Sequence, residues 1–168
     1  MKLVVALVFC IFLFGCAMAT NPVPETYAGP TATVTDSTTA VEGDLDQMFW
    51  VAAIDGKGIP NSYVASQAAS RGQGPFLTTK IVSRRVEAKP QSVKLIGSHI
   101  TAAPIIMLLA MPVGKFTTIE GEVEFTPSPG GAYVVKGDLR DKGAVWIEDA
   151  NTHEIVTEIV TKKSPRSK

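Results

Sequence analysis

Histidine and cysteine are the side chains that most often carry out catalysis or bind transition metals, and both are rare in this chain. The sequence contains two histidines, His99 and His153, and two cysteines, Cys10 and Cys16. Neither histidine lies in a nucleophile or metal-ligand signature, and the G-x-S-x-G and H-E-x-x-H patterns are absent. We therefore expect His153 to lie in a turn and His99 on a strand face, and the sequence predicts no catalytic residue.

Carboxylates are the remaining groups with metal-binding chemistry. Glu120, Glu122 and Glu124 alternate along one segment. Same-face neighbours on a strand are about 7 Å apart, because each residue rises about 3.3 Å. This spacing suits a solvated face better than a cage of six to eight oxygens around calcium. The sequence predicts neither a metal site nor a cofactor.

Aromatic residues could form a platform on which a sugar stacks. Trp50 lies in a run that is apolar on both faces, so we expect it to pack in a core. Trp146 alternates with Val145 and Ile147 and is the better candidate for a half-exposed ring, although packing against a neighbouring strand is the favoured role.

The beginning of the chain predicts a chemical modification. Lys2 precedes an apolar run from Leu3 to Phe14, which is typical of a secretory signal and shorter than the roughly 20 residues that span a bilayer. The run ends in Leu13-Phe14-Gly15-Cys16, which resembles the bacterial lipobox. The resemblance implies that residues 1–15 are removed and that Cys16 carries a diacylglyceryl group. Phe14 departs from the lipobox pattern, which usually has a small residue there.

Two alternatives for the mature chain stay open. Ala17 after a modified Cys16 implies sorting to the outer membrane, with the domain facing the periplasm or the cell surface. In the other reading Ala17-Met18-Ala19 is a small-x-small cleavage site, and a soluble secreted protein begins at Thr20. Cys10 leaves in both cases, so the folded domain is expected to have no internal disulfide.

Composition excludes one class of partner and sets the organisation. The 168 residues include 16 basic and 16 acidic ones, and this balance argues against a nucleic-acid binder, which needs a basic face. Residues 16–30 hold three prolines and one glycine and predict a tether. Residues 31–161 predict one domain, and the basic residues 162–168 predict a disordered tail.

The domain is expected to be all-β, a single β-sandwich or partly open barrel, because short apolar segments alternate with turn residues. Ile119, Gly121, Val123 and Phe125 share one face of the clearest segment. The predicted strands are 47–54, 77–86, 92–100, 119–125, 132–136, 144–148 and 154–160.

Two segments are ambiguous. Residues 105–111 are apolar and bracketed by prolines, which favours a buried strand or a short packed segment. Residues 62–71 permit one or two helical turns, with Ser62 as a possible cap and Gly72 at the end.

Three segments carry a resemblance to a family. The stretch 84–95 (RRVEAKPQSVKL), together with 133–137 (YVVKG) and 145–150 (VWIEDA), resembles small bacterial lipoproteins with PEGA-like β-domains. Lys89 stands where that family usually has glycine. The resemblance implies an envelope lipoprotein with a β-sandwich, and it supplies no catalytic residues.

Together these features favour a non-catalytic envelope module that presents a sheet edge or loops to a protein or to the cell wall. The membrane would hold it through the lipid on Cys16. The alternative is an envelope hydrolase whose Asp, Glu and His residues come together only in the fold.

Overall fold

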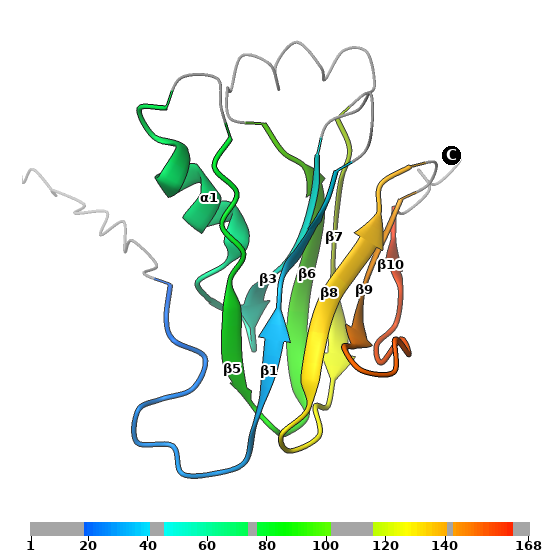
Figure 1. Ribbon diagram of the computed structural model, residues 1–168. Coiled ribbons are helices and arrows are strands. Elements are labelled where there is room, and N and C mark those ends of the chain that lie inside the picture. Colours follow the sequence, from blue (N-terminus) through cyan, green and yellow to red (C-terminus); the bar gives the residue numbers. More distant parts are fainter. Residues whose placement is uncertain (1–18, 41–45, 74–76, 102–115, 141–142, 163–168) are drawn as a thin grey trace, which may run out of the picture.

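The computed structural model describes residues 19–40, 46–73, 77–101, 116–140 and 143–162. Cys16, the apolar segment 105–111 and the tail residues 163–168 lie outside the described residues. Within the described part, strands form two five-stranded sheets that pack face to face, with one short helix beside them and no closed barrel (Figure 1). The expectation of a mostly β domain is confirmed.

The order of strands shows where each sheet ends. The first sheet has the order β10-β9-β8-β1-β5, and the second has the order β2-β3-β6-β7 with β4 paired to β3. Neighbours are antiparallel except β1 and β8, which are parallel. The elements are β1 Thr31–Thr35, β2 Ser37–Thr39, β3 Gln47–Ile54, β4 Lys57–Gly58, α1 Ser62–Ser70, β5 Ser83–Glu87, β6 Gln91–His99, β7 Thr118–Phe125, β8 Ala132–Asp138, β9 Ala144–Asp149 and β10 Val160–Thr161.

Several strand predictions are confirmed and two are wrong in extent. β3 has the predicted bounds, and its hairpin to β4 turns at Asp55-Gly56, both with positive φ. Of the predicted strand 77–86 only residues 83–86 are strand, and of 154–160 only the last residue belongs to β10. β1 and β2 were not predicted, because their threonine- and serine-rich sequences carry a weak apolar alternation.

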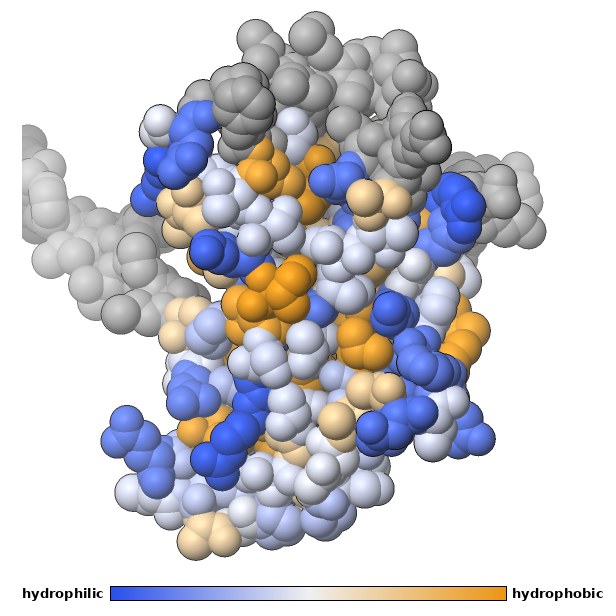
Figure 2. Space-filling view, in the orientation of Figure 1, coloured by the Kyte–Doolittle hydropathy of each residue, from blue (hydrophilic) through white to orange (hydrophobic). Residues whose placement is uncertain are grey.

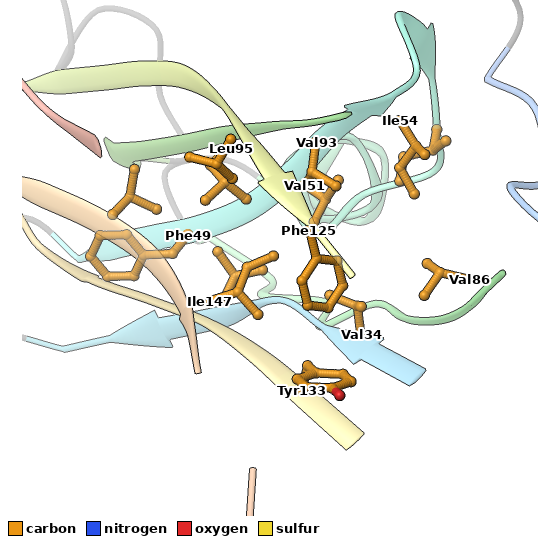
Figure 3. Packing of buried hydrophobic residues seen from close by; sticks show 14 of the residues in the cluster. Val34, Phe49, Val51, Ile54, Val86, Val93, Leu95, Phe125, Tyr133 and Ile147 are labelled. Atoms are coloured by element: carbon orange, nitrogen blue, oxygen red, sulfur yellow. The ribbon is translucent and has the colours of Figure 1, made fainter. Parts of the chain in front are cut away.

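The core lies between the two sheets. Val51, Leu95, Phe125 and Ile147 point toward one another from opposite layers (Figure 3), and each is at most 2% exposed. Phe125 of β7 meets Tyr133 of β8 edge to face, with ring centroids 5.0 Å apart. Ile119, Val123 and Phe125, which the sequence places on one face of the segment 119–125, are buried, and Gly121 on the same face is partly buried.

A buried ion pair joins the sheets where the chain crosses from one to the other. Asp36, between β1 and β2, pairs with Arg84 of β5, and both side chains are at most 5% exposed. The Asp36 carboxylate also accepts hydrogen bonds from Val51 N at 3.1 Å and from Ser62 N at 2.8 Å. One carboxylate thus connects the first sheet, the second sheet and the start of α1.

Helix α1 is attached through a row of serine hydroxyls. Ser62, Ser66 and Ser70 accept hydrogen bonds from the backbone N–H groups of residues 82, 80 and 78, at 2.8, 2.8 and 2.9 Å. Four helical residues rise about 6 Å and two extended residues rise about 6.6 Å, so the two periods nearly match. The extended segment 78–82 therefore bonds to a helix in place of a strand, which is why the predicted strand is shortened.

The cap of α1 corrects a sequence expectation. Asn61 is the N-cap, and its side chain accepts from Val64 N at 3.1 Å. Ser62 was the expected cap, but its hydroxyl binds Val82 N.

The outer face of the second sheet has its own small core. Met48, Trp50 and Ile100 are buried there, and Trp50 stacks on Tyr63 of α1 with centroids 5.1 Å apart. Trp50 packs in a core as expected.

Residues 19–30, in the segment expected to be a tether, contact the domain. Thr20 N donates to Gly58 O at 3.0 Å, and Val23 is 6% exposed.

Candidate functional site

A groove lies between one free edge of each of the two sheets. β7 ends the second sheet and β10 ends the first, and no described ladder joins them. A groove of about 520 Å³ runs between them, and its size falls within the range of common ligand sites. Its walls are residues 118–123 of β7 and residues 158–162 around β10.

The hydrogen bonds of β6 show which backbone groups of β7 face this groove. His99 N donates to Thr117 O at 3.2 Å toward β7, whereas Ser92 O accepts from Asp55 N at 2.8 Å toward β3. Successive residues of a strand direct their N–H and C=O groups to opposite sides. Odd-numbered residues of β6 therefore face β7.

The register then assigns the residues of β7. Leu95 is opposite Gly121 and Gly97 is opposite Ile119, so the odd-numbered residues of β7 bond to β6. The N–H and C=O groups of the even-numbered residues point to the free edge. These residues are Thr118, Glu120, Glu122 and Glu124. An edge with four such residues is a template for another strand.

The same three glutamates carry the charge of this edge. Their side chains are exposed, as the sequence predicted. Lys94 of β6 forms an ion pair with Glu120 at 3.1 Å, and Glu122 and Glu124 have no ion pair within the described residues. Across the groove lie Glu158 and Lys162.

Apolar side chains lie near the wall formed by β10. Ile155, Val156 and Ile159 are exposed by 47%, 39% and 49%. The face shown in Figure 2 carries separate hydrophobic groups among hydrophilic residues, without one continuous apolar patch. The groove itself is lined by apolar side chains, Ile159 and Val160 among them, as well as by charged ones.

A smaller cleft of about 280 Å³ lies beside α1, over the outer face of the second sheet. Its walls include the stacked rings of Trp50 and Tyr63 and the hydroxyls of Ser98 and Thr118, which are 2.7 Å apart. Ser98 also donates to His99 O at 3.1 Å. Both hydroxyl hydrogens are thus used within the sheet.

The two histidines are not brought together. His99 is buried at the end of β6, and its Nδ1 accepts from Thr117 N at 3.0 Å. His153 lies in the turn after β9, as predicted, and its Nδ1 is 3.5 Å from Glu148 Oε1. The described residues hold no group of three His, Cys, Asp or Glu side chains arranged to bind a metal ion.

Trp146 is half-buried in β9, and its indole N–H donates to Glu148 Oε2 at 3.4 Å. The polar end of the ring is thus paired within its own strand face. The half-exposed position predicted for this residue is confirmed.

Two carboxylates outside the groove have lowered pKa values. Hydrogen bonds from the Arg140 side chain hold the pKa of Asp138 below its usual value. Hydrogen bonds from the backbone N–H groups of Asn151 and Thr152 lower the pKa of Asp149. Asp149 thereby fixes the turn that leads from β9 toward β10.

Two of the three segments from which the sequence suggested a PEGA-like domain lie on neighbouring strands, whereas the third, 84–95, runs from β5 of the first sheet into β6 of the second. Residues 133–137 lie in β8 and residues 145–149 form most of β9, with Val135 opposite Ile147. Lys89 pairs with Glu87 at 2.6 Å, and this contact raises the pKa of Lys89.

Sequence reasoning identified the glutamate row but not the groove. The two walls are about 40 residues apart in the chain, and no local pattern reports that they meet. Among the described residues no helix is long and apolar enough to span a membrane. The chain matches no protein-family model, no curated protein and no solved structure.

Proposed function

We propose that this chain is a non-catalytic module of the bacterial envelope, anchored through a lipid on Cys16, which binds a protein partner along the free edge of β7. The observation that carries the proposal is the set of outward-facing backbone groups on β7 beside a groove of about 520 Å³. An extended segment that enters the groove would pair with β7 as an added strand.

In this proposal, a lipid on Cys16 attaches the module to the membrane. The tetrad ending in Cys16 and the preceding apolar run support lipidation. Two or more acyl chains hold a protein stably at a membrane, whereas one chain binds only marginally. Labelled palmitate should enter the wild-type protein and not Cys16→Ser. Equal labelling of both, with Thr20 as the mature N-terminus, would establish the soluble secreted form.

Hydrogen exchange tests the strand addition directly. The probe is a capped eight-residue peptide of alternating threonine and glutamine, which favours an extended chain and has no charge. The amides of residues 118, 120, 122 and 124 should exchange quickly in the free protein and slowly with the peptide bound. Unchanged exchange at all four, with this peptide and its charged analogues, would overturn strand addition.

A proline in β7 provides a second, structural test. The N–H of Glu122 faces the free edge, so Glu122→Pro removes one donor from the groove and leaves the ladder to β6 in place. Glu122→Gln is the matched control, because it keeps that N–H. Peptide protection should be lost in the proline variant and retained in the control, with both variants folded by circular dichroism.

A further inference from the structure

We propose that the segment received by β7 is basic at alternate positions, with lysines or arginines opposite the row of glutamates. This inference rests on the proposed function and names its partner class. Side chains of an added strand alternate between the two faces of the sheet, as those of β7 do. One face of the added strand therefore lies beside Glu120, Glu122 and Glu124.

On that face, β6 carries fewer positive charges than β7 carries negative ones. Directly opposite the three glutamates stand Ile96, Lys94 and Ser92, so β6 offers one cation to three carboxylates. Lys94 is placed opposite Glu122 but reaches diagonally to Glu120.

Two carboxylates are thus left without a charged partner within the described residues. Neighbouring glutamates stand about 7 Å apart, which is within the Debye length of about 8 Å at physiological ionic strength, so they repel one another. An added strand puts its own side chains about 5 Å from those of β7, nearer than the glutamates are to each other. Opposite charges there remove the repulsion, and an acidic segment would increase it.

The far wall of the groove does not supply the missing cations. It holds one acidic and one basic residue, Glu158 and Lys162, whose charges cancel. The groove as a whole therefore stays acidic.

Three peptides separate this inference from the function on which it rests. They are capped eight-residue chains in which threonine alternates with lysine, glutamine or glutamate. The lysine peptide should bind about tenfold more tightly than the glutamine peptide, since two to three cross-strand charge pairs are gained. The glutamate peptide should bind more weakly than both. Equal affinities with protection of the β7 amides would overturn the inference alone, whereas no protection by any peptide would overturn the proposed function.

Matched charge variants locate the effect. In Glu122→Gln/Glu124→Gln the lysine peptide should bind no better than the glutamine peptide. The control is Glu25→Gln/Glu154→Gln, which makes the same change in net charge at two exposed residues outside the groove. The preference for lysine should persist in this control and should shrink as salt rises. Loss of the preference in both variants would show that only net charge is sensed, and would overturn the assignment to β7.

The chain has a basic segment of its own in residues 163–168. Deleting it should leave the affinity for the lysine peptide within about twofold. Binding that appears only after the deletion would make this segment the occupant, and would overturn the proposal of a separate partner.

Discussion

Val160 of β10 lies directly over Gly121 of β7. A Cβ atom added at Gly121 would stand 2.6 Å from Val160 Cγ1, closer than packed carbon atoms approach. Because Gly121 has no side chain, the valine can pack against the core and bring the edges of the two sheets together at this point. The floor of the groove is thus set by one glycine and one valine.

Gly121→Ala should therefore destabilise the domain by about 1–3 kcal/mol, the usual cost of inserting a methyl group into a packed site. Gly121→Ala/Val160→Ala should regain part of the loss, because the clashing methyl groups are gone. Gly58→Ala is the control, since nothing lies within 4 Å of a Cβ there. Urea unfolding measures all three, and an equal loss in the single and double variants would contradict the contact.

Arg84→Met should cost about 3–5 kcal/mol, because it leaves the Asp36 carboxylate buried without its cation. Arg85→Met is a close control, since Arg85 is the next residue of the same strand and is exposed. Chemical denaturation should show a change within about 0.5 kcal/mol for that control. Similar losses in the two variants would mean that the ion pair does not hold the sheets together.

Ser66→Ala should cost about 1–3 kcal/mol, because the N–H of Lys80 loses its acceptor. The Lys80 amide should also exchange faster with solvent. Val64→Ala changes the same helix at a residue that is 60% exposed and should alter stability by less than about 0.5 kcal/mol. A protected Lys80 amide in Ser66→Ala would show that the serine row does not hold the extended segment.

The lowered pKa of Asp149 predicts a dependence of stability on pH. The pKa of this carboxyl is lower in the folded than in the unfolded chain, so its contribution is fully present above about pH 4 and is lost as the pH falls through the folded value. Asp149→Asn should melt below the wild type at pH 7, and the two curves should converge in acid. A melting difference that stays constant down to pH 2 would contradict this assignment.

The sequence predicted best where a strand has its own repeating pattern. β7 alternates apolar and acidic residues, and the direction of every side chain in it follows from that alternation. The helix cap was placed one residue late, because Ser62 is a good cap in isolation and is bound by Val82 in the fold. A local sequence pattern does not show which distant backbone group a serine hydroxyl will bind.

Of the candidate site, too, one part could be predicted from the sequence and another could not. The exposed row of glutamates could be predicted, because it depends on one strand. The groove could not, because it requires β10 to lie beside β7, and this contact depends on Val160 packing over Gly121. Relationships between distant segments are set by the packing of the whole core.

The position of β1 has a consequence for how the protein is made. β1 lies in the interior of the first sheet, between β5 and β8, and Thr33 pairs with Ala132 in the last quarter of the chain. β1 is therefore synthesised long before its partner β8. Pairing between segments so distant in the chain is slow. Until residues 132–138 have been synthesised, the first sheet lacks its middle strand β8, and β1 can pair only with β5.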